Sequence, residues 1–179
     1  MKVLAAVACL AAVAAAAVGI GLVERDATVS YNGMTCGAVP CESIPLGMES
    51  TVVSFRGNRD YRRILLGFDV PRDPPASCSL MIPRPVEGAD YKLAVVETDS
   101  NWDEATVSGA TKSIDGTRIA TVSAPDASVD ITDACRRAAG KRLSLFVNTE
   151  AQGVTFNSRQ SGKDDVFAIQ YAYPPPVHD

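Results

Sequence analysis

The sequence predicts an all-β fold, an antiparallel β-sandwich or jelly roll, and two observations carry the prediction. Short segments alternate apolar and polar residues with the period of two that is typical of a β-strand, so that Val53 and Phe55 share one face of the segment 51–56. Turn-forming residues such as Pro71 and Gly116 separate these segments. Many short strands at this spacing favour two packed antiparallel sheets over alternating strand–helix units.

We expect the same alternation to define strands at 51–56, 63–70, 79–82, 91–98, 118–122, 128–131, 143–148, 154–157 and 166–173. One short helix is expected at 133–139. Thr132 is suited to cap its start, Arg136 and Arg137 lie towards its end, and Gly140 follows it as a left-handed terminator.

The N-terminal segment predicts secretion. Lys2 is followed by an alanine-rich run with no charge as far as Gly21, and small residues suited to cleavage lie between Ala14 and Gly21. We therefore expect a signal peptide at 1–21, a domain at 26–173 and a Pro-rich tail at 174–179. A membrane anchor is the alternative, since the run is nearly long enough to span a bilayer. After cleavage we expect no stable membrane insertion.

The cysteines support an oxidising compartment. Cys9 lies in the expected signal peptide, and the other four, Cys36, Cys41, Cys78 and Cys135, make an even number. Three pairings are possible, and we expect a local Cys36–Cys41 bridge across a turn and a long-range Cys78–Cys135 bridge. Zinc is not expected, because the spacings match no zinc pattern and His178 is the sole histidine.

The charge of the chain argues against nucleic acid as a partner. A net charge of −4 gives no general basic surface for phosphates. No sequence signature of a hydrolase nucleophile, P-loop, dinucleotide site or zinc protease is present, so we expect no enzymatic activity. A stand-alone lyase or hydrolase, working through carboxylates such as Asp130 and Asp133, has the least support.

Several motifs resemble one family. The segment 101–107 (NWDEATV) resembles the S-W-D-E-A-T-V signature of the DNRLRE family, which is also classed as carbohydrate-binding module family 96. Similar matches follow the family's order at 26–29 (DATV), 63–70 (RILLGFDV), 129–133 (VDITD) and 154–162 (VTFNSRQSG). The resemblance implies a secreted, non-catalytic β-sandwich that binds an acidic polysaccharide such as alginate. The chain departs from the family pattern at 36–41, where a cysteine-bracketed loop replaces an N-Y-G-like loop, and at Gln160, which replaces a glutamate.

Within these motifs we expect structural roles for Trp102, Asp103, Glu104 and Arg159. Trp102 could offer a ring face to a sugar, but we expect it to anchor the core with its indole N–H hydrogen-bonded. Arg159 is expected to pair with Asp103 or Glu104 and so to join two motif loops.

A cluster of arginines is the predicted binding site. Four guanidinium groups and one aromatic ring lie on an expected hairpin, at Arg56, Arg59, Tyr61, Arg62 and Arg63. Such a cluster could hold the carboxylates of a uronate polymer in bidentate fashion. The alternative is a solvated turn that Asp60 partly neutralises.

Carboxylates raise the possibility of a structural Ca²⁺ ion. Asp26 opens the first motif strand, and Asp164 and Asp165 precede the last, so the three could converge as hard oxygen ligands. The predicted function is adhesion to an extracellular, acidic polysaccharide. The alternative is a secreted structural, cell-wall or effector interaction protein that kept the fold without binding sugar.

Overall fold

The computed structural model describes residues 17–150 and 153–174. The calcium, arginine and disulfide predictions fall on these residues, whereas Cys9, most of the expected signal peptide and most of the Pro-rich tail lie outside them. The elements along the chain are β1 (Val18–Leu22), β2 (Arg25–Ser30), β3 (Thr35–Cys36), β4 (Val39–Pro40), a 3-10 turn at Cys41–Ser43, β5 (Thr51–Arg56), β6 (Tyr61–Asp69), β7 (Ser77–Met81), β8 (Lys92–Thr98), β9 (Thr117–Ser123), β10 (Ser128–Asp130), α1 (Thr132–Arg137), β11 (Arg142–Thr149), β12 (Val154–Asn157), a 3-10 turn at Arg159–Ser161 and β13 (Ala168–Ala172).

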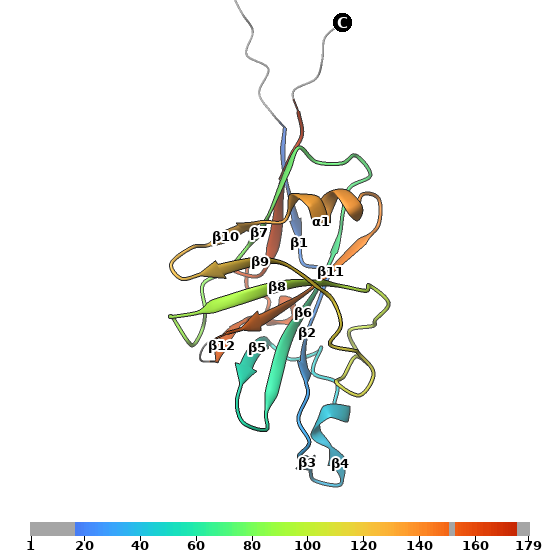
Figure 1. The fold of residues 1–179 in the computed structure, drawn as a ribbon, viewed down its shortest axis with the longest axis vertical. Helices are drawn as coiled ribbons and strands as arrows, with labels where there is room; N and C mark the ends of the chain where they lie inside the picture. The colour runs from blue at the N-terminus through green and yellow to red at the C-terminus, as the bar shows by residue number, and fades with distance from the viewer. Residues whose placement is uncertain (1–16, 151–152, 175–179) are drawn as a thin grey trace, which may run out of the picture.

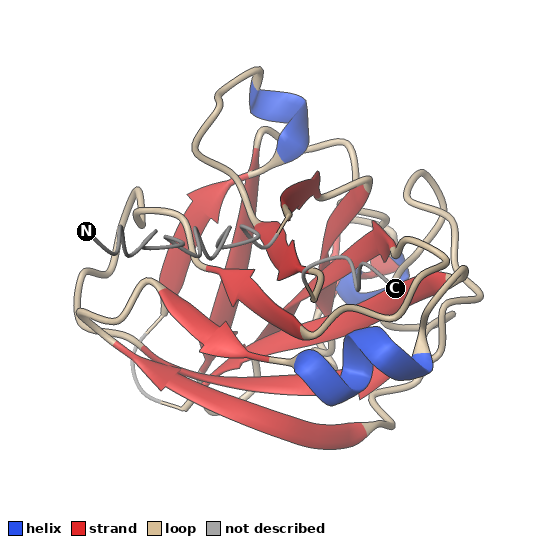
Figure 2. Cartoon of the chain, turned by 90° about the horizontal axis from the view of Figure 1, so that it is seen from above, coloured by secondary structure: helices blue, strands red, loops and turns tan. Residues whose placement is uncertain are grey.

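Two antiparallel sheets form the sandwich, which confirms the predicted fold class (Figures 1 and 2). The small sheet has the order β1-β13-β7-β10, and the large sheet has the order β12-β5-β6-β11-β8-β9, with β2 also paired to β6. Each of the nine strands expected from alternation is present, and its ends lie within two residues of those expected.

The main core fills the space between the two sheets. Alternate residues of β6, Ile64, Leu66 and Phe68, point inward and are fully buried. They meet Leu80 of β7 and Ile169 of β13 from the small sheet. Phe156 and Phe167 pack edge to face there, with ring centroids 5.0 Å apart. Burial of these alternating side chains is what selects the strand register.

A second apolar cluster lies on the other face of the large sheet. Leu65 of β6 and Phe146 of β11 point outward there and are covered by Trp102 and Val107 of the long connection between β8 and β9. Val29 of β2 completes this cluster. The NWDEATV segment therefore acts as a lid on the large sheet, and only part of this outer face is left open to solvent.

The two expected disulfides are present. Cys36 and Cys41 join across the small β3–β4 hairpin with their Cα atoms 4.9 Å apart. Cys78 of β7 and Cys135 of α1 join with their Cα atoms 6.4 Å apart, and this bridge fixes the helix to the small sheet.

The helix is present, but its expected cap is wrong. It begins at Thr132, and Ile131 takes the N-cap position without a side-chain hydrogen bond. The Thr132 hydroxyl is otherwise engaged: it accepts a hydrogen bond from the backbone N–H of Cys78 at 2.9 Å and bonds Asp130 Oδ1 at 2.6 Å. Gly140 does adopt the expected left-handed conformation, with φ of 69°. Tertiary contact with β7 thus overrides the local capping preference.

Asp26, the expected start of the domain, lies in β2, and one further strand, β1, precedes it. Strand β1 pairs with β13 over five residues, from Val18 opposite Ala172 to Leu22 opposite Ala168. The two described ends of the chain leave the molecule side by side (Figure 1). Part of the segment 1–21, expected to be removed as a signal peptide, therefore forms a sheet strand.

Candidate binding surface

The arginine hairpin does not form one surface. Because successive strand residues point to opposite faces, β6 directs Tyr61 and Arg63 to the outer face of the large sheet and Arg62 to the inner one. The structure shows two separate hollows: one includes Tyr61 and Arg63, the other Arg62, and Arg56 borders both. Arg59 lies at the exposed turn and lines neither hollow. The prediction of a single five-residue patch is therefore wrong.

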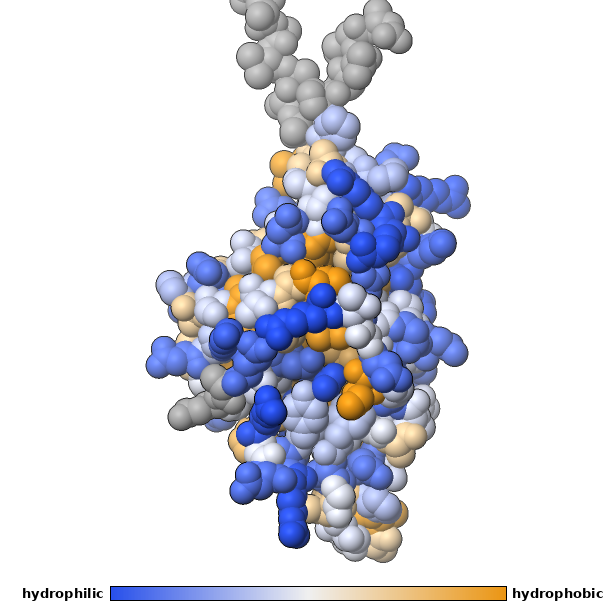
Figure 3. Space-filling model, in the orientation of Figure 1, coloured by the Kyte–Doolittle hydropathy of each residue, from blue (hydrophilic) through white to orange (hydrophobic). Residues whose placement is uncertain are grey.

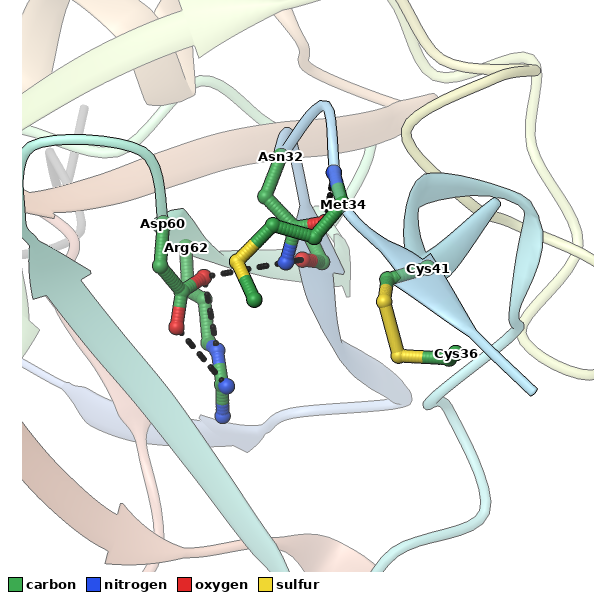
Figure 4. The surroundings of a disulfide bond; sticks show 7 residues. Asn32, Met34, Cys36, Cys41, Asp60 and Arg62 are labelled. Carbon is green, nitrogen blue, oxygen red and sulfur yellow. Dashed lines mark hydrogen bonds and ion pairs between the residues drawn. A yellow bond between two sulfur atoms is a disulfide. The ribbon is translucent and has the colours of Figure 1, made fainter. Parts of the chain in front are cut away.

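Arg62 is neutralised within the hairpin. Its guanidinium bonds the Asp60 carboxylate twice, with Nη2 to Oδ2 at 2.8 Å and Nε to Oδ1 at 3.1 Å. Asn32 Nδ2 donates to the same Oδ1 at 3.3 Å, and Figure 4 shows this network beside the Cys36–Cys41 bridge. The predicted neutralised turn thus applies to Arg62, which has little charge left to offer a ligand.

Arg63 lies in different surroundings, against three aromatic rings. Its guanidinium carbon is 4.7 Å from the centroid of Tyr61, 5.5 Å from that of Phe146 and 5.9 Å from that of Tyr31. Its Nη1 donates to the carbonyl of Ile114 at 3.2 Å, while Nε is buried without a hydrogen-bond partner among the described residues. No carboxylate in that part of the chain forms an ion pair with it. Arg63 is therefore a positioned cation with unused donor capacity.

The hollow around Arg63 has a volume of about 300 Å³. We call it the Arg63 cup; its principal lining residues are Arg56, Tyr61, Arg63, Ile114, Arg118 and Asn148. Residues from β5, β6, β8, β9 and β11 contribute to it, so the outer face of the sheet forms its floor. Its volume lies at the lower end of the range typical of small-molecule sites.

Arg118 adds a third cation to the cup, beside Arg56 and Arg63. Its Nη1 contacts Glu150 Oε1 at 2.7 Å, and its Nη2 donates to Thr121 Oγ1 at 2.6 Å. The hydrogen bond from Arg118 holds the pKa of Glu150 below its usual range. Glu150 remains ionised at neutral pH and offsets part of the Arg118 charge, so Arg56 and Arg63, which form no ion pair among the described residues, carry most of the uncompensated charge of the cup.

Asn148 is the buried polar group in the cup. Its side chain is only 6% exposed, and its Oδ1 atom has no hydrogen-bond partner among the described residues. Buried polar atoms are nearly always satisfied by protein, water or ligand. This oxygen is itself enclosed, so a donor in the cup would reach it only after a small movement of the lining residues.

Tyr31 contacts Arg63 but does not line the cup. Burial raises the pKa of Tyr31 to about 12, despite the opposing influence of Arg63. Its hydroxyl donates to the carbonyl of Lys112 at 2.9 Å. Tyr31 is therefore uncharged at neutral pH, and its ring supports the Arg63 guanidinium from outside the cup.

The predicted calcium ligands do not converge. Both carboxylate oxygens of Asp26 already accept protein hydrogen bonds, from Ser158 Oγ at 2.7 Å and from the Arg159 backbone N–H at 2.8 Å. Asp165 instead accepts from the backbone N–H of Arg84. The described residues contain no group of three or more acidic, histidine or cysteine side chains suited to a metal ion, so the site predicted from Asp26, Asp164 and Asp165 is not formed.

Asp26 instead belongs to a buried network that joins the family-like motifs. Its backbone N–H donates to Glu104 Oε1 at 2.8 Å, and Glu104 in turn pairs with Arg159. Burial raises the pKa of the Asp26 carboxyl, while the bonds from Arg159 and Ser158 oppose this rise. Asp103 is exposed and only caps its own turn, through the backbone N–H of Ala105. These residues hold the fold together and leave no free group for a ligand.

Trp102 is structural as well. Its side chain is 9% exposed, its indole N–H donates to Ser144 Oγ at 2.9 Å, and the Arg25 guanidinium lies over the ring at 4.2 Å. The ring face is therefore occupied by Arg25 and closed to a sugar. The core-anchor role expected for Trp102 agrees with this geometry.

Sequence reasoning missed Arg118, Asn148 and Ile114 as members of the cup. They come from three separate segments. Sheet pairing places Asn148 opposite Ala94 and Arg118 opposite Val96, and Ile114 lies in the connection before β9. The one available signal was alternation, which places Asn148 and Phe146 on the same face of 142–149. Alternation alone does not show which residues of other strands lie beside Asn148, because that depends on the strand order.

The fold and the site together define a β-sandwich protein with two disulfides and a cationic cup on one sheet face. No protein-family model matches the chain. It is similar to an uncharacterized secreted protein from Arthroderma benhamiae, with 28% identity over 160 residues that cover 82% of each chain. Among the described residues no helix is both long and apolar enough to cross a membrane. The predicted extracellular location agrees with this relative.

Proposed function

We propose that the protein is a non-catalytic binding protein for an extracellular, acidic polysaccharide, and that the Arg63 cup is its contact site. The observation that carries this proposal is the state of Arg63: a guanidinium held by three aromatic rings, with no carboxylate partner in the described chain. A uronate carboxylate is a natural ligand for such a group, because the planar guanidinium fork matches the two carboxylate oxygens.

The other groups in the cup suit a sugar. The polar side chain of Asn148 lines the cup, and the ring of Tyr61 offers apolar surface there. The ring of Tyr31, which lies outside the cup, has its centroid 6.4 Å from that of Tyr61. The resemblance of the chain to the DNRLRE family supports the same ligand class. The cup holds no carboxylate pair free for acid–base chemistry, since Glu150 is engaged by Arg118.

Retention of the secreted protein on immobilised alginate, pectate, chitin and neutral glucan tests the proposal. We expect retention on the two uronate polymers that weakens at high salt, because charge contacts between exposed groups are screened. Arg118→Ala and Asn148→Ala should each weaken binding several-fold. Arg63→Lys should also weaken it, because lysine keeps the charge but not the bidentate geometry.

Two arginines of the same hairpin provide matched controls. Arg59 lies outside the cup and Arg62 is paired with Asp60, so Arg59→Ala and Arg62→Ala should bind as the wild type does. Near-ultraviolet circular dichroism would establish that each variant is folded. Absence of retention on all four polymers, or equal losses in Arg59→Ala and Arg118→Ala, would exclude the cup as a polysaccharide site.

A second candidate function is a secreted interaction protein that binds no sugar. The observation that favours it is an open hollow of about 820 Å³ between α1 and β9, with Ile119 and Ile131 among its lining residues. Apolar side chains gather at the surface in this region (Figure 3). Binding to a protein ligand that Ile119→Glu abolishes and Arg118→Ala leaves intact would favour this function.

A further inference from the structure

The first strand is built for its place in the small sheet. Its two glycines, Gly19 and Gly21, point inward and alternate with large side chains that point outward. A Cβ atom at Gly19 would lie 2.2 Å from Cε2 of Tyr171, and one at Gly21 would lie 3.1 Å from Cγ1 of Ile169. The side chains of Tyr171 and Ile169 thus occupy the space that a larger residue at Gly19 or Gly21 would need. This close fit shows that β1 packs specifically against β13.

The pairing extends beyond both ends of the strand. The Tyr173 backbone N–H donates to the Ala17 carbonyl at 3.0 Å, and the Val23 N–H donates to the Phe167 carbonyl at 3.2 Å. Val23 is only 5% exposed and belongs to the main core. The segment from Ala17 to Val23 is therefore part of the folded domain, and its loss would expose the edge of β13.

The pairing of β1 with β13 limits where the signal peptide can be cleaved if the mature protein is to keep this strand. A signal peptidase needs small residues one and three positions before the bond that it cuts, after an apolar stretch. Cleavage at the expected limit, after Gly21, would remove four of the five residues of β1. The residues before Ala17 include Ala14 and Ala16 at the required positions, downstream of the apolar run that begins at Val3.

We propose that the signal peptide is removed at the Ala16–Ala17 bond, so that the mature protein begins at Ala17 and keeps all of β1. In this step water hydrolyses the peptide bond, leaving a carboxylate on Ala16 and a free α-amino group on Ala17. Cleavage at this bond retains the Ala17 carbonyl that pairs with Tyr173. This inference is independent of the proposed polysaccharide binding.

The experiment is secretion of the full chain from a host with a signal peptidase, followed by N-terminal sequencing and intact-mass measurement of the secreted protein. The expected first residue is Ala17. Any other first residue would overturn the assignment of the bond. Retention of residues 1–16 would overturn the cleavage itself. A start at Leu22 or later would also show that β1 is not part of the mature domain.

Two variants test the roles of the residues on either side of the bond. Ala16→Arg removes the small residue before the bond, and we expect it to stop secretion of the Ala17 form. Gly33→Ala, where the added Cβ meets no atom within 4 Å, is the matched control for Gly19→Ala. Gly19→Ala should lower the Tm of the secreted protein by more than about 5 °C, whereas Gly33→Ala should change it little. Equal Tm values for these two variants would contradict the packed role of β1.

Discussion

The guanidinium of Arg159 meets the carboxylate of Glu104 in two parallel contacts, Nε to Oε1 at 2.9 Å and Nη2 to Oε2 at 2.8 Å, across 55 positions of the sequence. Gln160 Nε2 donates to the same Oε2 at 3.1 Å. Glu104 also accepts from the backbone of Asp26, so three segments that are remote in sequence converge on one carboxylate. The pairing with Glu104 raises the pKa of Arg159, which keeps it charged.

Arg159→Ala should therefore destabilise the protein. Removing this partner leaves the nearly buried Glu104 carboxylate short of two hydrogen bonds, and we expect a loss of about 1.5–3 kcal/mol in the free energy of unfolding. Urea denaturation followed by circular dichroism would measure it. Arg59→Ala, at an exposed turn, should change stability by less than about 0.5 kcal/mol. Similar midpoints for the two variants would show that the Arg159–Glu104 pair is dispensable.

The single tryptophan gives a probe of the lid on the large sheet. Trp102→Ala would leave a cavity over Leu65 and Phe146 and an unpartnered Ser144 hydroxyl, so we expect a loss of about 3–5 kcal/mol. Ser144→Ala removes only the hydrogen bond to the indole and should cost about 1 kcal/mol. Tryptophan fluorescence of wild type and Ser144→Ala during denaturation, compared with circular dichroism, would show whether the lid unfolds with the sandwich. A smaller loss for Trp102→Ala than for Ser144→Ala would contradict this packing.

Local patterns in the sequence predicted the strands but not all of their partners. Alternation in 63–70 and 143–148 marks the residues that face the main core, among them Leu66 and Leu145, and it is visible without knowing the fold. The split of Tyr61 from Arg62 was visible in the same way, since adjacent strand residues face opposite sides. Proximity in sequence therefore does not bring Tyr61 and Arg62 into one site.

Other features depend on contacts that no local pattern contains. The cup needs Asn148 of β11 and Arg118 of β9 beside Arg63 of β6, an arrangement set by strand order. Strand β1 was missed because its apolar residues continue the alanine-rich run, although the alternation of glycine with large residues at 18–22 is itself a strand pattern. The Thr132 cap failed because a partner on β7 competes for its hydroxyl.

The two disulfides should contribute unequally to stability. The Cys78–Cys135 bridge closes a loop of 57 residues, whereas Cys36–Cys41 closes one of 5. If a bridge acts by restricting the unfolded chain, removing the first costs about 4 kcal/mol and removing the second about 2 kcal/mol. Paired Cys→Ala variants compared by urea denaturation would test this order. A larger loss from the Cys36–Cys41 pair would mean that the small hairpin has a role beyond chain restriction.

The ion pair between Asp99 and Lys112 predicts a pH dependence of stability. Lys112 is buried, and its ammonium group bonds both the carboxylate and, at 2.9 Å, the backbone carbonyl of Asp99. The hydrogen bond from Lys112 lowers the pKa of Asp99 below its value in the unfolded chain. The unfolded state therefore binds the proton more readily, and the contribution of the pair is complete above about pH 4 and is lost as the pH falls through the lower, folded-state pKa.

Asp99→Asn should consequently be less stable than the wild type at pH 7, by at most about 1 kcal/mol because the carboxylate is largely exposed. The difference in Tm between the two proteins should shrink as the pH falls from 5 towards 2. Asp164→Asn, at an exposed position before β13, is the matched control and should show no such convergence. A difference between wild type and Asp99→Asn that is the same at pH 7 and pH 2 would show that Lys112 is held by the Asp99 carbonyl and gains nothing from the carboxylate charge.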